Sequence, residues 1–157
     1  MDHSIETLLE AYRRAGLRIA TAESCTGGMV AAALTDVAGS SDVFDRGMVT
    51  YSNAAKTDLL DVSPDTLAAH GAVSEQVAQE MAQGALAASL ADVAVSVTGI
   101  AGPGGSEFKP EGRVCFGLAR KDRPIQVETV EFGAQGRAIV RLAATAHTLQ
   151  MLRSALD

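Results

Sequence analysis

Two kinds of apolar pattern alternate along this chain. Apolar side chains at helical spacing predict helices over residues 4–15, 29–37, 54–62, 74–90 and 134–156, with a shorter one starting at 63–65. Short apolar runs predict strands over 17–22, 46–52, 93–98, 113–120 and 125–132. Helices that interleave with apolar strands predict a layered α/β fold with a mixed sheet.

Capping residues define several of these boundaries. Asn53 is the expected N-cap of the helix over 54–62, and Ser74 that of the helix over 74–90. The run over 93–98 is small and β-branched throughout, as in a buried strand of a parallel sheet. The last helix is expected to place one set of apolar residues on one side: Ile139, Leu142, Ala146, Leu149 and Leu152.

Three polar or glycine-rich loops each follow directly after an apolar run, over residues 23–28, 50–56 and 98–106. Ligands of open α/β sheets bind at the carboxyl ends of the strands. If the three preceding strands are parallel, these loops converge at one edge of the sheet. We therefore expect a binding site at that edge.

The first loop offers a nucleophile at a point where a strand turns into a helix. Glycine permits a sharp turn, and the first N–H groups of a helix lack intrahelical partners, so we expect them to bind an anion or an oxyanion. Ser24 and Cys25 are the candidate nucleophiles. Neighbours on an extended chain point opposite ways, so at most one faces the site, and a buried structural role is favoured for Cys25. The loop lacks the Gly-x-x-x-x-Gly-Lys-Ser/Thr pattern of phosphate-binding loops.

A serine nucleophile needs a base to take its proton. His3, His70 and His147 lie at the terminus, beside a turn and on the last helix, settings that favour surface positions. Lys56 is the other candidate base, provided that burial or a nearby cation lowers its pKa, and Tyr51 could relay or orient the proton. Spacing alone favours a solvated Lys56 in the first turn of a helix.

Four cationic residues near the loops are candidate anion contacts. Arg137 and Arg141 are four residues apart on the last helix and share a face that could clamp a phosphate. A solvated helix face is the simpler interpretation of this pair. Lys109 and Arg113 lie near the third loop.

Composition narrows the class of protein. The chain has 157 residues, is 47% hydrophobic and has a net charge of −6, with no basic run that would suit a general nucleic-acid binder. No stretch has the length and purity of a membrane span, and charged residues interrupt the segment where a signal peptide would lie. Cys25 and Cys115 form neither a disulfide framework nor a metal-binding spacing. We expect one domain over 1–157 in a reduced, cytoplasmic protein.

The motifs resemble the C-terminal domain of the competence/damage-inducible CinA family, which includes stand-alone nicotinamide-nucleotide amidases. The matching segments cover nearly the whole chain: 21–28, 39–41, 50–56, 70–74, 96–106 and 136–141. The chain differs from the family pattern at Ala134-Gln135-Gly136-Arg137, where Gly-Asp-Arg is expected. The resemblance implies a three-layer α/β/α sandwich with a largely parallel sheet. It also implies that this chain lacks the N-terminal domain, similar to molybdopterin-binding proteins, of longer relatives.

The resemblance implies roles for individual residues. Ser24 falls on the nucleophile, Lys56 on its partner and Tyr51 on the tyrosine of the same motif. The backbone of one segment falls on the oxyanion hole: Cys25, Thr26, Gly27 and Gly28. A larger set is expected to contact the substrate: Glu23, Asn53, Thr98, Gly99, Gly102, Gly104, Gly105, Ser106, Arg137 and Arg141.

The reaction implied is hydrolysis of the carboxamide of nicotinamide mononucleotide, through a Ser–Lys acyl-enzyme and without a metal or cofactor. The implied partner is this small nucleotide, with no nucleic acid or membrane, and the Ala-rich helices suggest a homo-oligomer of two or more chains. Two other functions stay open: a non-catalytic nucleotide-binding module linked to competence or DNA damage, and an amidase of another small amide. Ammonia release from nicotinamide mononucleotide would exclude the first of these.

Overall fold

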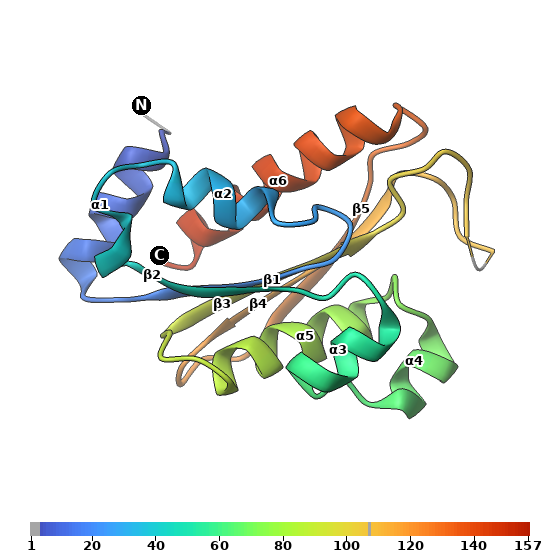
Figure 1. Ribbon diagram of the computed structural model, residues 1–157, viewed down its shortest axis with the longest axis horizontal. Coiled ribbons are helices and arrows are strands. Elements are labelled where there is room, and N and C mark those ends of the chain that lie inside the picture. Colours follow the sequence, from blue (N-terminus) through green and yellow to red (C-terminus); the bar gives the residue numbers. More distant parts are fainter. Residues whose placement is uncertain (1–3, 107) are drawn as a thin grey trace.

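A central sheet separates two layers of helices in the computed structural model, which describes residues 4–106 and 108–157 (Figure 1). One face of the sheet carries α1 (Ile5–Ala15), α2 (Met29–Thr35) and α6 (Arg137–Ser154). The opposite face carries α3 (Asn53–Leu60), α4 (Pro64–His70) and α5 (Glu75–Ala87). The expected three-layer α/β/α sandwich is confirmed. A short 3-10 turn at Ser40–Asp42, which the pattern did not predict, precedes the second strand.

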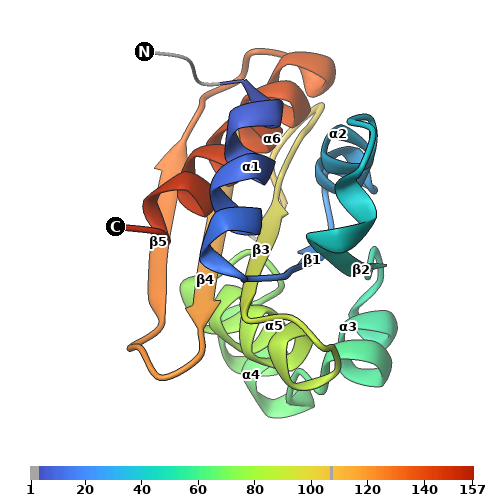
Figure 2. The same cartoon turned by 90° about the vertical axis from the view of Figure 1, so that its left-hand side faces the viewer.

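The sheet has five strands in the order β2-β1-β3-β4-β5. Their bounds are β1 (Ile19–Glu23), β2 (Phe44–Val49), β3 (Val93–Gly99), β4 (Arg113–Arg120) and β5 (Gln126–Glu131). β1 lies between β2 and β3 and runs parallel to both, whereas β4 pairs antiparallel with β3 and β5 pairs antiparallel with β4 (Figure 2). The carboxyl ends of β1, β2 and β3 therefore meet at one edge, and the expected convergence of the three loops is confirmed.

Side-chain alternation along β1 divides the core between the two layers. Ile19 packs with the helices of the α1, α2 and α6 layer, whereas Ala20 and Ala22 pack with α5 and its neighbours. Small residues let α5 lie very close to the sheet. A Cβ atom added to Gly117 on β4 would lie 2.5 Å from the carbonyl oxygen of Ala78 on α5. A side chain at Gly117 would therefore push α5 away from β4.

Several predicted boundaries are wrong because tertiary contacts decide them. β2 ends at Val49 rather than at residue 52, since its partner β1 ends at Glu23 and the chain beyond Thr50 leads into α3. The N-cap of α3 is Ser52, whose Oγ accepts a hydrogen bond from the Ala55 N–H at 3.1 Å, and Asn53 is instead the first helical residue. α2, α5 and α6 are each shorter than predicted.

The predicted apolar side of α6 is also wrong in its first half. Ile139 and Leu142 are 55% and 60% exposed, and Ala146 is exposed as well. The face that packs against β3 and β4 is rotated and carries Val140 and Ala144 in their place. Leu149 and Leu152, in the second half, are buried as expected.

Candidate active site

The turn after β1 separates the two candidate nucleophiles. Ser24 still pairs with the sheet, because its N–H donates to the Val97 carbonyl at 2.9 Å, and its side chain points toward α3. Cys25 packs into the core cluster of the opposite layer, and burial raises the pKa of its thiol to about 11. The burial expected for Cys25 is confirmed. Gly27 and Gly28 take φ values of 59° and 108°, where a side chain would be strained, and so permit the turn.

Glu23 closes the first turn of α2 from the end of β1. Its buried carboxylate accepts hydrogen bonds from Thr26 Oγ1 at 2.6 Å, from the Val30 N–H at 2.9 Å and from the Ala31 N–H at 3.0 Å. The expectation that these helix N–H groups are open to an anion is therefore wrong. Glu23 does not line the cavity described below, so its expected contact with substrate is corrected to a capping role.

Ser24 and Lys56 form a buried pair across the sheet edge. Lys56 lies in the first turn of α3, and its Nζ lies 3.0 Å from Ser24 Oγ. Nζ also donates to the Thr50 carbonyl at 2.9 Å. The residue is only 1% exposed, and no carboxylate of the described residues forms a salt bridge with it. The interpretation of Lys56 as a solvated helix residue is wrong.

Burial controls the protonation of Lys56. Its transfer out of water disfavours the ammonium form, so the pKa of Lys56 lies below its usual range. A neutral amine has a lone pair that can accept the hydroxyl proton of a serine at this distance. The pair thus has the chemistry of a base and a nucleophile.

A cavity of about 380 Å³ opens over this pair, at the small end of the range of ligand pockets. Twelve of the predicted site residues line it: Ser24, Cys25, Tyr51, Asn53, Lys56, Thr98, Gly99, Gly102, Gly104, Gly105, Ser106 and Arg137. The remaining wall comes from Ala72, Val73, Ile100, Ala101 and Pro103. Ala72 and Val73 were assigned no role from the sequence, although they lie in the motif over 70–74 that carries the family resemblance.

Arg137 links two of the converging loops across the mouth of the cavity. Its Nη1 donates to the Gly102 carbonyl at 2.8 Å, and its Nη2 donates to the Tyr51 hydroxyl at 2.7 Å. Tyr51 is 60% exposed, and its hydroxyl has no hydrogen bond with Lys56 or Ser24. In this conformation Tyr51 contacts the arginine rather than the Ser–Lys pair.

The lining is cationic although the whole chain is acidic. Its cation is Arg137, since the buried Lys56 amine acts in its neutral form, and among the described residues the lining includes no Asp or Glu. The net charge of the chain is −6. A cavity with this charge pattern favours an anionic ligand.

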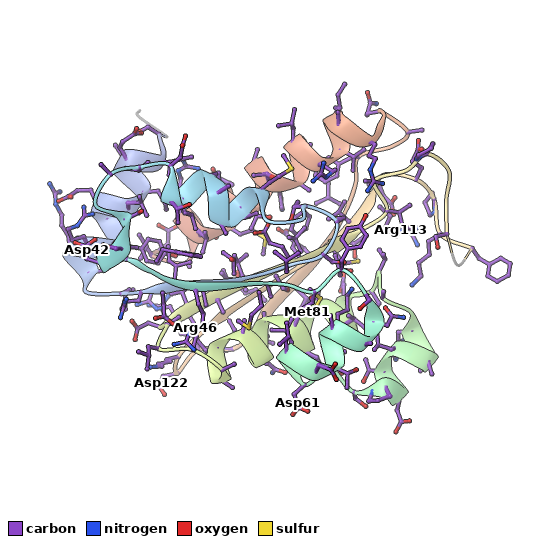
Figure 3. The ribbon with its side chains drawn as sticks, in the orientation of Figure 1. Asp42, Arg46, Asp61, Met81, Arg113 and Asp122 are labelled. Carbon is purple, nitrogen blue, oxygen red and sulfur yellow. The ribbon has the colours of Figure 1, made fainter. Side chains whose placement is uncertain are left out.

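The other three cationic residues that were candidate anion contacts bind other groups of the protein. Arg141 Nε donates to the Cys25 carbonyl at 3.0 Å and its Nη2 to the Thr26 carbonyl at 3.3 Å, and Arg141 does not line the cavity. Lys109 Nζ donates to the carbonyls of His70, the last residue of α4, and of Val73, both at 2.6 Å. Arg113, the first residue of β4 and labelled in Figure 3, forms a salt bridge with Glu131 at 2.6 Å.

The histidines are not placed to act as the base. His70 ends α4 and His147 contacts Glu128, and neither lines the cavity, whereas His3 lies outside the described residues. Across the described ranges, no group of three or more His, Cys, Asp and Glu residues could hold a metal ion. None of the helices in these ranges is long and apolar enough to cross a membrane.

Comparison with known proteins places these features in a family. The pattern of the CinA C-terminal domain matches residues 2–156. The nicotinamide-nucleotide amidohydrolase PncC of Enterobacter agglomerans is 57% identical over 89% of this chain and 85% of its own length. PncC of Escherichia coli K12 is 53% identical over 94% of this chain and 89% of its own length.

Longer proteins and solved structures are similar as well. A putative competence-damage inducible protein of Caldicellulosiruptor saccharolyticus is 48% identical over 96% of this chain, which spans only 36% of that protein. The crystal structure of a competence/damage inducible protein from Agrobacterium tumefaciens superposes with a TM-score of 0.93 at 48% identity. That superposition covers 97% of this chain and 92% of the other.

Proposed function

This chain belongs to the CinA C-terminal domain family, and on that premise we propose that it is a nicotinamide-nucleotide amidohydrolase. The reaction converts nicotinamide mononucleotide and water into nicotinic acid mononucleotide and ammonia. The observation that carries the proposal is the buried Ser24–Lys56 pair, 3.0 Å apart, beneath a cationic cavity. The relatives named for this activity cover most of the chain.

Ser24 is the nucleophile and neutral Lys56 is its base. Lys56 takes the hydroxyl proton while Ser24 Oγ forms a bond to the carboxamide carbon, which becomes tetrahedral with a negative oxygen. Lys56 then returns the proton to the amide nitrogen, the C–N bond breaks and ammonia leaves. Water, activated by the same amine, cleaves the resulting ester and restores Ser24. The hydrogen bond from Lys56 to the Thr50 carbonyl keeps the amine directed during both steps.

Backbone N–H groups of the turn after β1 stabilise the tetrahedral oxygen. The N–H groups of Cys25 and Thr26 donate to no other residue of the described chain. The Gly27 N–H donates to the Ser24 carbonyl at 3.0 Å, which removes it from this set. Each aligned donor of this kind contributes about 3 kcal/mol to the transition state.

Arg137 is the contact for the substrate phosphate. Its guanidinium has five N–H donors, and the bonds to Gly102 and Tyr51 use two of them. The first turn of α6 has no side-chain cap, so its partial positive charge adds to that of Arg137 at the same end of the helix. Arg137 therefore orders the loops over 50–56 and 98–106 and still presents donors to a phosphate. Asn53 and the glycine-rich loop border the rest of the nucleotide.

The test is ammonia release from nicotinamide mononucleotide by the purified protein, with nicotinic acid mononucleotide identified as the second product. Ser24→Ala should lower kcat by about 10⁴-fold or more, because it removes the oxygen that forms the ester in the proposed mechanism. Ser41→Ala, an exposed serine in the turn before β2, is the matched control and should keep wild-type activity. Thermal unfolding of both variants shows that the fold is retained.

Three results would contradict this assignment in different ways. Binding of nicotinamide mononucleotide by the wild type without ammonia release would favour the non-catalytic module. Release of ammonia only from other amides would keep the Ser–Lys chemistry and change the substrate. Full activity of Ser24→Ala would exclude Ser24 as nucleophile and turn attention to Cys25.

A further inference from the structure

Arg141 holds the nucleophile turn from the side opposite the Ser24–Lys56 pair. It lies one helical turn after Arg137 on α6, and its guanidinium donates to the carbonyls of Cys25 and Thr26 at 3.0 and 3.3 Å. These bonds join residues more than 110 positions apart in the sequence. A Cβ atom on Gly27 would lie 3.3 Å from Arg141 Nη2, so the turn and the guanidinium are in close contact.

Because a peptide unit is planar, the direction of the Cys25 carbonyl also sets the direction of the Thr26 N–H. The Cys25 carbonyl and the Thr26 N–H belong to one trans peptide unit and point in opposite directions. Because Arg141 fixes the carbonyl toward α6, the Thr26 N–H points away from α6. The layer that holds α3 and Lys56 lies on the other face of the sheet (Figure 1). The Thr26 N–H is thus directed away from the α6 layer, toward the side of the reacting pair.

The Thr26 N–H is an exception among buried backbone groups. Thr26 is 0% exposed and lies directly behind Ser24 and Cys25, which line the cavity as Thr26 itself does not. Its hydroxyl donates to Glu23, and its N–H donates to no other described residue. Most buried N–H groups have a partner, and an orphan in a native fold requires an explanation. A developing oxyanion next to Ser24 would be that partner.

We propose that Arg141 is a positioning residue for the oxyanion hole, which holds and polarises the Cys25–Thr26 peptide. The inference rests on the proposed amidohydrolase function. It replaces the expected contact of Arg141 with the substrate phosphate, since its bonds are made to the turn and its side chain does not line the cavity. The two arginines that share one face of α6 then have different kinetic roles.

The experiment compares Arg141→Met with Arg137→Met in steady-state hydrolysis of nicotinamide mononucleotide. Loss of an oxyanion-hole donor lowers kcat by about 10²–10³-fold, and we expect Arg141→Met to lose kcat by about 10²-fold with little change in KM. Arg137→Met should mainly raise KM, because its guanidinium faces the substrate. Gln150→Ala, an exposed change on the same helix, is the control for α6 and should leave both constants unchanged.

Arg141→Lys keeps the cation but offers a point donor instead of a planar fork, and it should restore part of kcat. If Arg141→Met unfolds, the kcat and KM of Arg141→Lys test the inference instead. Addition of guanidinium to a folded Arg141→Ala variant should likewise raise kcat without changing KM. In the ¹⁵N spectrum, the Thr26 amide of the wild type should shift when a boronic acid analogue of nicotinamide forms a tetrahedral adduct with Ser24, and this shift should shrink in Arg141→Lys.

The outcomes separate this inference from the function on which it rests. A wild type that releases no ammonia overturns the amidohydrolase assignment and the inference together. An active wild type in which Arg141→Met and Arg141→Lys change mainly KM overturns the inference alone and returns Arg141 to substrate binding. Wild-type kcat in a folded Arg141→Met variant overturns it as well.

Discussion

Replacement of Lys56 by methionine separates the chemistry of this side chain from its packing. Methionine has an unbranched chain of similar length but no amine to take the proton of Ser24. Nζ lies 3.0 Å from Ser24 Oγ in a residue that is almost fully buried. Removal of a positioned general base lowers a rate by about 10²–10⁴-fold, and we expect kcat for ammonia release to fall at least that far.

The same substitution should change how stability depends on pH. Burial in the folded chain lowers the pKa of Lys56 below its usual value of 10.5, which the unfolded chain keeps. Between the lowered pKa and 10.5 the unfolded chain holds a proton that the folded chain has released. The free energy of unfolding of the wild type therefore rises with pH across this window and falls as pH decreases through it. The rise is about 1.4 kcal/mol for each unit by which folding lowers the pKa.

Urea unfolding of both proteins from neutral to alkaline pH measures this term. In Lys56→Met the Thr50 carbonyl loses its donor, which costs about 1–3 kcal/mol at every pH. Only the change with pH in the difference between the two free energies reports the titration of Lys56. In parallel, kcat/KM of the wild type should rise with pH through the lowered pKa, because the neutral amine is the active form.

Two results would refute this reasoning. One is a difference in unfolding free energy between wild type and Lys56→Met that stays constant up to the usual pKa of lysine, since Lys56 would then titrate as a solvated residue does. The other is a Lys56→Met protein with wild-type kcat, which would show that another group takes the proton of Ser24.

Three further predictions follow from contacts around the site. Glu23→Gln should lower the free energy of unfolding by about 2 kcal/mol and reduce kcat, because an amide cannot accept all three hydrogen bonds from Thr26, Val30 and Ala31. Urea unfolding measures the loss, and Glu10→Gln on α1 is the control. Gly84→Ala should lower Tm strongly, since its Cβ would lie 1.9 Å from the Leu60 carbonyl, and an unchanged Tm would contradict the close packing of α3 on α5. Light scattering should give a mass of two or more 16.2-kDa chains, and a monomer would contradict the expected homo-oligomer.

Local patterns were sufficient for the elements and for much of the site. The apolar run of β3 and the Ser74 cap of α5 depend on neighbouring residues, so both are readable from the sequence and both are confirmed. The three loops could be picked out because polar and glycine residues follow each parallel strand directly. The resemblance to a family added the pairing of Ser24 with Lys56, which spacing alone did not favour.

Tertiary structure decided what those residues contact. No local pattern shows that Lys56 is buried, with a lowered pKa, or that Glu23 caps α2. Nor does a local pattern show that Arg141 donates to the carbonyls of the turn after β1. The sequence determined that a strand leads directly into Ser24 and that a helix carries Arg141. Strand order and helix rotation place these elements against one another across more than 110 residues of chain. Hydrophobic periodicity specifies which face of an element is buried but not which partner covers it, and that choice belongs to the packing of the whole domain.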